Sequence, residues 1–220
     1  MQKSETQSGD SRINIPWLLA MVFNPLILPP ALFSLLAFHS GALPAEVRRV
    51  TLVAMVLYFV IPGLYLIALQ ASGRISTIEA RDRERRSTPL MIGAVYLIIV
   101  VPLMWAQAET STTIVTSFAL ITAANAFIIA FITRWFKISM HVASVAGFFA
   151  VLQTVNWITG EAMAGGFFLL ISAAVLIPII MWARIADDAH SKKEVFSGLL
   201  FGIIILPLEL GALHTLGIIF

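Results

Sequence analysis

The chain has no cysteine and few charged residues: only 12% of its 220 residues are Asp, Glu, Lys or Arg, against 59% that are hydrophobic. Without cysteine, disulfide bonds and thiolate nucleophiles or metal ligands are excluded. Soluble domains carry about a quarter charged residues, so this composition excludes a soluble globular protein, and its high apolar content excludes a disordered one. The net charge of +2 is too small to predict nucleic acid binding. We therefore predict an integral membrane protein.

Long charge-free runs divide the chain into segments that can each cross a bilayer, which takes about 20 apolar residues. Such runs are too long for barrel strands, and in lipid the backbone must satisfy its own hydrogen bonds, so helices are expected. The sequence thus predicts an all-α, polytopic transmembrane helical bundle of about seven spans. We expect these spans near residues 15–38, 51–72, 90–107, 113–133, 142–159, 163–183 and 194–218.

The first run is interrupted near its middle by Asn24-Pro25 and Pro29-Pro30. Each half is too short to span alone, so we expect one broken or kinked helix rather than a helical hairpin. Residues 1–12 have no apolar core and are interpreted as a polar N-terminal tail, with no cleavable signal peptide. Residues 13–220 are expected to form a single transmembrane helical domain.

The positive charges are distributed very unevenly between the two predicted sides. With seven spans, the side that holds the N-terminus carries twelve of the 14 Lys and Arg residues. The positive-inside rule places this side in the cytoplasm. We expect the protein to lie in a plasma membrane, namely the inner membrane of a bacterium. The twelve cations are Lys3, Arg12, Arg74, Arg81, Arg83, Arg85, Arg86, Arg134, Lys137, Arg184, Lys192 and Lys193, and the other side has only Arg48 and Arg49.

Polar residues concentrate in three segments of that side: 79–89, 134–141 and 184–194. An even number of spans separates each pair of segments, so all three are predicted at one membrane surface. Each segment alone is typical of a cytoplasmic loop that anchors helices and contacts lipid headgroups. Together they place two histidines and several arginines at the same surface.

The third segment has the spacing of a paired imidazole and carboxylate. If Asp187 or Asp188 caps the last helix, His190 and Glu194 lie four residues apart on one helical face. A carboxylate in that position holds one imidazole nitrogen and increases the nucleophilicity of the other. In the second segment, Ser139 is predicted as an N-cap, which places His141 in a first helical turn that favours an anion.

Two histidines and several arginines together supply the groups needed to hydrolyse a phosphate ester. Arginines bind phosphoryl oxygens bidentately, one histidine attacks phosphorus, and the other protonates the leaving oxygen. The sequence contains no obvious Asp/Glu array for Mg²⁺, so we expect neither a metal nor another cofactor.

These residues resemble the three signatures of the type 2 phosphatidic acid phosphatase superfamily of membrane lipid phosphatases. The third signature is matched by Arg184-x5-His190-x3-Glu194, the second by Ser139-Met140-His141, and the first, most loosely, by Arg83-x2-Arg86-x2-Pro89. Glu194 stands where the family has aspartate, Met140 replaces a glycine, and two residues separate Arg86 from the proline. The first two signatures are also two spans apart here, whereas better-known members keep them in one loop.

The resemblance implies a six-helix phosphatase-like core, with one further span in this chain. It implies that His190 forms a phosphohistidine, that Glu194 orients it, and that His141 is the general acid. Phosphate would be held by Arg83, Arg86, Arg184, Lys137 and the backbone near Ser139. The substrate implied is a membrane lipid phosphate, either a phosphomonoester or a prenyl diphosphate, cleaved without metal at the surface of the lipid bilayer.

Three alternatives remain open at this point. The motif departures are compatible with a catalytically altered member of the family. Membrane prenyltransferases also carry acidic loops, which would here be formed by Asp82 and Glu84 and by Asp187 and Asp188. The spaced aspartates of that family are absent from this sequence, and its members have more spans. A lipid or small-molecule transporter is the third option, because Glu209 and His214 lie within the last span. Transport predicts an essential Glu209 and a dispensable His190, and hydrolysis predicts the reverse.

Overall fold

The computed structural model describes residues 14–77, 83–160 and 165–219, and within 83–86 it describes only the backbone. The predicted polar tail, 1–12, lies outside this part. The described residues form helices and connecting loops without a strand, which confirms the all-α prediction. Six helices are long and apolar enough to cross a membrane: Pro44–Ala71, Ser87–Trp105, Thr112–Ile132, Met140–Thr159, Gly166–Ala186 and Lys192–Thr215.

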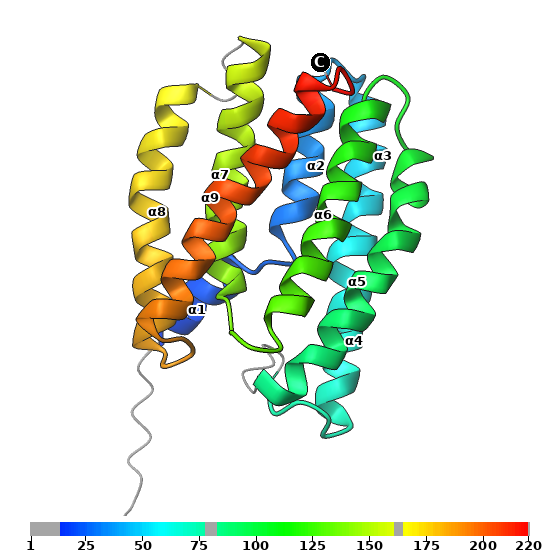
Figure 1. Ribbon diagram of the computed structural model, residues 1–220. Helices are drawn as coiled ribbons and strands as arrows, with labels where there is room; N and C mark the ends of the chain where they lie inside the picture. The colour runs from blue at the N-terminus through cyan, green and yellow to red at the C-terminus, as the bar shows by residue number, and fades with distance from the viewer. Residues whose placement is uncertain (1–13, 78–82, 161–164, 220) are drawn as a thin grey trace, which may run out of the picture.

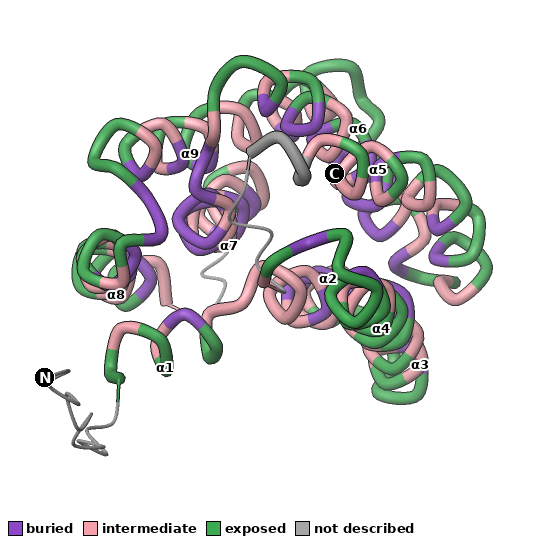
Figure 2. Tube along the Cα trace, turned by 90° about the horizontal axis from the view of Figure 1, so that it is seen from below, coloured by how far each residue is buried: buried purple, intermediate pink, exposed green. Residues whose placement is uncertain are grey.

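The long helices run alternately up and down and form one bundle (Figure 1). The last five are α5 (Arg83–Trp105), α6 (Thr112–Ile132), α7 (Met140–Thr159), α8 (Gly166–Ala186) and α9 (Lys192–Thr215). Exposed residues line the outer faces, whereas α7 is largely buried (Figure 2). Large apolar side chains such as Phe38, Trp157 and Phe167 are at least 72% exposed, as expected for surfaces that face lipid.

The first predicted span is broken, as expected, into α1 (Ile15–Val22) and α2 (Leu28–His39). Asn24 stabilises the turn between them, because its Oδ1 accepts a hydrogen bond of 2.9 Å from the Leu26 N–H. The two halves are also displaced sideways: α1 packs against α8 at the lower end, whereas α2 lies in the upper half of the bundle (Figure 1). α2 therefore does not extend into the lower half of the bundle.

The second predicted span, 51–72, starts earlier than expected and contains a wide turn. α3 (Pro44–Ala54), a π-helical segment η1 (Met55–Val60) and α4 (Ile61–Ala71) form one continuous helix. In the π-helical register, the Ile61 N–H donates to the Val56 carbonyl. The next residue, Pro62, has no N–H and therefore cannot donate to the Leu57 carbonyl. The carbonyl of Leu57 instead accepts a 2.9 Å hydrogen bond from the Tyr96 hydroxyl of α5.

The third predicted span also starts too late, at residue 90 instead of Arg83. The prediction took the end of the charge-free run as the end of the helix, but a helix continues beyond the apolar region wherever its backbone remains hydrogen-bonded. Arg83, Arg86 and Pro89 consequently lie inside α5 rather than in a loop before it. Arg and Glu are good helix formers, which is compatible with this extension.

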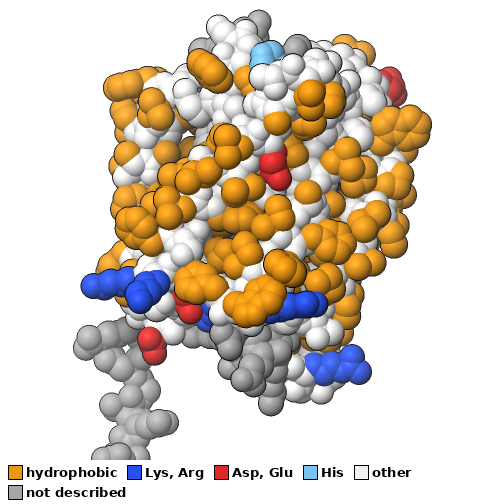
Figure 3. All heavy atoms as spheres, viewed as in Figure 1, with side chains coloured by type: hydrophobic (Ala, Val, Ile, Leu, Met, Phe, Trp, Pro, Cys, Tyr) orange, Lys and Arg blue, Asp and Glu red, His pale blue; other side chains and the backbone are white. Residues whose placement is uncertain are grey.

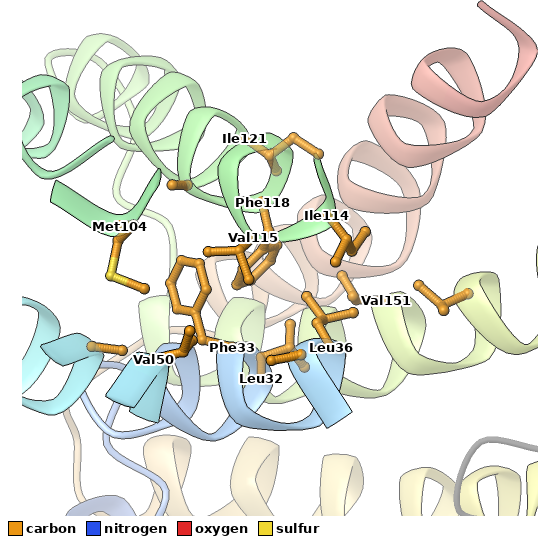
Figure 4. Close-up of a cluster of buried hydrophobic side chains, with 14 of the residues drawn as sticks. Leu32, Phe33, Leu36, Val50, Met104, Ile114, Val115, Phe118, Ile121 and Val151 are labelled. Carbon is orange, nitrogen blue, oxygen red and sulfur yellow. The ribbon is translucent and has the colours of Figure 1, made fainter. Parts of the chain in front are cut away.

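The apolar core lies in the half of the molecule that α2 occupies. Phe33 of α2 contacts Tyr58 and Phe118, with ring centroids 5.0 Å and 4.9 Å apart. Side chains from α3, α5, α6 and α7 complete this cluster (Figure 4). The opposite end of the molecule carries the charge, since the Lys and Arg side chains on the visible face gather at its lower rim (Figure 3).

Candidate functional site

A cavity of about 490 Å³ opens among the helices, and the first turns of α2 form part of its wall. Its walls are mostly apolar and come from the α1–α2 connection and from α2, η1 and α4 to α9. At one end it is lined by four polar side chains: Lys137, His141, Arg184 and His190. The cavity therefore combines an apolar body with a basic end.

His190 is held by the start of α9. Its Nδ1 lies 2.9 Å from Oε2 of Glu194, and the residue is only 9% exposed. An ionised carboxylate only accepts hydrogen bonds, so this contact places the proton on Nδ1, and Nε2 is the ring nitrogen without a proton. The pairing of these two residues predicted from their spacing is present in the structure.

The residue that caps α9 differs from the prediction. Neither Asp187 nor Asp188 is the N-cap; Ser191 is, in a capping box in which its side chain accepts from Glu194 N–H and Glu194 accepts from Ser191 N–H. His190 consequently precedes the helix instead of lying on its face. Several residues in this loop can act as caps, and the path of the chain decides between them.

The loop before α9 is built around the end of α8. The backbone N–H groups of Ala189 and His190 both donate to the Arg184 carbonyl at 3.2 Å, and Asp188 adopts a left-handed conformation with φ 50°. The Arg184 side chain is 1% exposed, and its Nη1 lies 3.9 Å from Asp187 Oδ2. This turn fixes Arg184 and His190 relative to each other.

Lys137 links the second polar segment to the third. Its ammonium donates a hydrogen bond of 2.9 Å to the Ala189 carbonyl, across the loops that precede α7 and α9. Ser139 makes a second link, because its backbone N–H donates to the Glu194 carbonyl at 3.1 Å. Two segments more than 50 residues apart in sequence are thus joined at one end of the bundle, as the even number of spans predicts.

The N-terminus of α7 approaches α9 closely because α9 has glycine at the contact. A Cβ at Gly198 would lie 2.5 Å from the Ser139 carbonyl oxygen, and one at Gly202 would lie 2.5 Å from that of Ala143. Ser139 is the N-cap residue of α7, but its side chain forms no capping hydrogen bond, and it is completely buried. His141 follows in the first turn and is 6% exposed.

The structure thus brings most of the predicted site residues together. His190, His141, Arg184 and Lys137 line the same cavity, Glu194 supports His190, and Ser139 lies at the α7–α9 contact. The side chains of Arg83 and Arg86 lie outside the described residues. Among the residues that the structure describes, no group of three His, Asp or Glu side chains is positioned to hold a metal ion.

Sequence reasoning did not place Tyr58, Thr122 and Asn125 at this site, although all three line the cavity. Asn125 was recognisable as a polar residue within a span, but the sequence does not indicate which face of α6 points inward, since apolar residues surround the helix on all sides. Its partner is Glu209, which accepts a 2.6 Å hydrogen bond from Asn125 Nδ2.

No family model, no curated protein and no solved structure matches this chain.

Proposed function

We propose that this protein is a membrane phosphatase that hydrolyses a lipid phosphomonoester or diphosphate through a phosphohistidine, without a metal. The observation that carries the proposal is the carboxylate-paired His190, which shares the end of an apolar cavity with His141, Arg184 and Lys137. The apolar body of the cavity suits a lipid chain, and its basic end suits a phosphate. The motif resemblance to type 2 phosphatidic acid phosphatases supports the same activity.

In the first chemical step, His190 Nε2 forms a bond to phosphorus while the bond from phosphorus to the lipid oxygen breaks. His141, in its protonated form, gives a proton to that leaving oxygen. Arg184 and Lys137 balance the negative charge of the phosphoryl oxygens, and the burial of Arg184, which is 1% exposed, strengthens its interaction with them. Glu194 stabilises the positive charge that develops on His190.

In the second step, water attacks the phosphohistidine, and His141 accepts the proton of that water. The bond between phosphorus and His190 Nε2 breaks, inorganic phosphate leaves, and the original protonation states are restored. The two steps together consume one water for each phosphate released, so the cycle needs no other reactant.

We place the basic end of the bundle on the cytoplasmic side of a plasma membrane, because the sequence predicts twelve of the 14 cations on that side. A lipid phosphate in the cytoplasmic leaflet then has its headgroup at the depth of His190 and its chain in the cavity.

Phosphate release from a panel of lipid phosphates in detergent tests the proposal, with EDTA present. We expect His190→Ala and His141→Ala each to lower kcat by at least about 10²-fold, the usual contribution of a nucleophile or a general acid. His214→Ala is the matched control, because His214 lies at the opposite end of α9. Full activity of both site variants would refute the mechanism.

The same assay separates hydrolysis from transport. Hydrolysis predicts that Glu209→Gln retains phosphate release while His190→Ala loses it. Loss of function in Glu209→Gln together with full function in His190→Ala would support a transporter instead.

A further inference from the structure

One face of α7 forms part of the cavity wall. It includes Met140, His141, Ser144 and Phe148, which are three or four residues apart and therefore lie on one side of the helix. Ser144 is in the middle of this face, and it is partly exposed although the residues on either side of it in sequence are buried. The side chain of Ser144 therefore faces the cavity.

Ser144 differs from the other hydroxyl residues that line the cavity. The hydroxyls of Tyr58, Tyr96 and Thr122 form hydrogen bonds within the protein. The hydroxyl of Tyr65 is buried. The Ser144 hydroxyl makes no hydrogen bond to any residue that the structure describes, and it is not one of the buried unpaired atoms of that part of the chain. It is thus an accessible polar group in a mostly apolar wall.

The position of Ser144 relates it to the reacting phosphate of the proposed mechanism. α7 starts at the basic end, and Ser144 is three residues, or about 4.5 Å of helix, further from that end than His141. Single bonds are about 1.5 Å long, so an extended chain covers this distance in about three bonds. With the leaving oxygen at His141, the lipid atom at the level of Ser144 is the third atom beyond that oxygen.

The lipid classes that the proposed function admits differ at this third atom. In a glycerol-based lipid phosphate, it is the oxygen on the second carbon of the glycerol. In a prenyl phosphate, it is a carbon of the hydrocarbon chain. A serine hydroxyl can donate one hydrogen bond, so it can bind the oxygen and not the carbon.

We propose that Ser144 donates a hydrogen bond to the third atom beyond the leaving oxygen, and that the cavity thereby prefers glycerol-based lipid phosphates to prenyl phosphates. The inference rests on the proposed function, because that function places the phosphate at His190 and the leaving oxygen at His141. The preference is moderate. When a carbon occupies the third position, the Ser144 hydroxyl can turn to the Met140 carbonyl of its own helix instead of remaining unpaired.

Two synthetic phosphates of equal chain length isolate this atom: decyloxyethyl phosphate has oxygen in the third position, and n-tridecyl phosphate has carbon. The measured quantity is the ratio of their kcat/KM values in detergent. We expect this ratio to be about 5-fold higher in the wild type than in Ser144→Ala, the effect of one hydrogen bond. Alanine is a better helix former than serine, so the variant should fold and should retain its kcat/KM for tridecyl phosphate.

Thr154→Val is the matched control, because it removes another hydroxyl of α7. The Thr154 hydroxyl donates to the Ala150 carbonyl at 2.7 Å and does not line the cavity, so we expect this variant to keep the wild-type ratio. A ratio in Ser144→Ala that equals or exceeds that of the wild type, or an equal fall in Thr154→Val, overturns the proposal.

Binding of the two phosphonate analogues, in which a CH2 group replaces the leaving oxygen, separates this proposal from the proposed function. Calorimetry in detergent measures their affinities without turnover. A preference for the decyloxyethyl analogue that falls about 5-fold in Ser144→Ala supports the inference even where no phosphate is released, and then only the phosphatase proposal fails. A preference that is unchanged in Ser144→Ala, with hydrolysis intact, overturns the inference alone.

Discussion

Glu194 has two roles at the start of α9. Its carboxylate accepts from the Ser191 N–H and so completes the capping box, and the same oxygen lies 2.9 Å from His190 Nδ1. Helix capping and orientation of the imidazole thus depend on one side chain. Glutamate has a longer side chain than the aspartate of the type 2 phosphatidic acid phosphatase signature, and it reaches His190 although His190 precedes the helix instead of lying on it.

Glu194→Gln separates the two roles. Glutamine can still accept from Ser191, so we expect the melting temperature to remain close to that of the wild type. It lacks the negative charge that stabilises a protonated or phosphorylated imidazole, so kcat should fall by about 10²-fold or more. Lipid phosphate hydrolysis and thermal unfolding in detergent measure both effects, and an unchanged kcat would contradict the proposed role of Glu194.

Among the helices, the contact of α7 with α9 determines the geometry of the site. Gly198 allows the Ser139 backbone to approach α9, and that approach places the first turn of α7 beside the His190 loop. Small residues permit such close contacts between membrane helices.

Gly198→Ala tests this contact, and Gly211→Ala in the same helix is its matched control. A Cβ at Gly198 meets the Ser139 backbone, so we expect a loss of about 1–3 kcal/mol in the free energy of unfolding and a marked loss of activity. A Cβ at Gly211 meets nothing within 4 Å, so alanine there should be neutral or stabilising by up to about 1 kcal/mol. Equal effects at both positions would contradict close α7–α9 packing as the cause.

The π-helical segment η1 gives a second prediction at the level of helices. Tyr96→Phe removes the donor for the Leu57 carbonyl, and we expect a loss of about 1–3 kcal/mol, the usual effect of leaving a buried acceptor unpaired. Tyr65→Phe is the control, because the Tyr65 hydroxyl has no partner among the described residues. Denaturation in mixed micelles measures both, and a smaller loss for Tyr96→Phe than for Tyr65→Phe would refute the explanation.

Across the whole molecule, the two ends have different polar chemistry. At the end opposite the basic cluster, the Glu46 carboxylate accepts hydrogen bonds from the backbone N–H groups of Glu109, Thr110 and Ser111 and from the Ser111 hydroxyl, at 2.6–3.1 Å. This contact fastens the start of α3 to the α5–α6 loop. It is a structural anchor, since the carboxylate is 4% exposed and its oxygens are occupied by these donors.

The absence of cysteine allows the orientation to be measured with single introduced cysteines. Ser72 and Lys193 are exposed at the basic end, and Ala106 and Thr215 are exposed at the other. With a membrane-impermeant maleimide on intact cells, we expect Ala106→Cys and Thr215→Cys to be labelled. Ser72→Cys and Lys193→Cys should be labelled only after permeabilisation, and the reverse pattern would contradict a cytoplasmic basic end.

Much of the architecture could be predicted because it depends on local properties of the chain. Apolar runs predict helices, and the parity of spans predicts that Lys137 and the His190 loop lie at the same membrane surface. Their contact, the hydrogen bond from Lys137 to the Ala189 carbonyl, is known only from the structure. The helix starts at Arg83 and Pro44 were missed because a charge or a proline ends an apolar run without ending the backbone hydrogen bonding. The cap at Ser191 was missed because Asp187, Asp188 and Ser191 are all competent N-caps.

The sequence by itself determined that the protein is an all-α membrane bundle with its basic residues at one end, because hydropathy and charge decide which segments lipid accepts. Only the tertiary structure decided that the break after α1 leaves a cavity between the helices. It also decided that His190, His141 and Arg184 line this cavity. The physical reason is that the sideways displacement and the rotation of packed helices decide which side chains converge. Where apolar residues are distributed around a whole helix, the sequence does not encode the rotation of that helix.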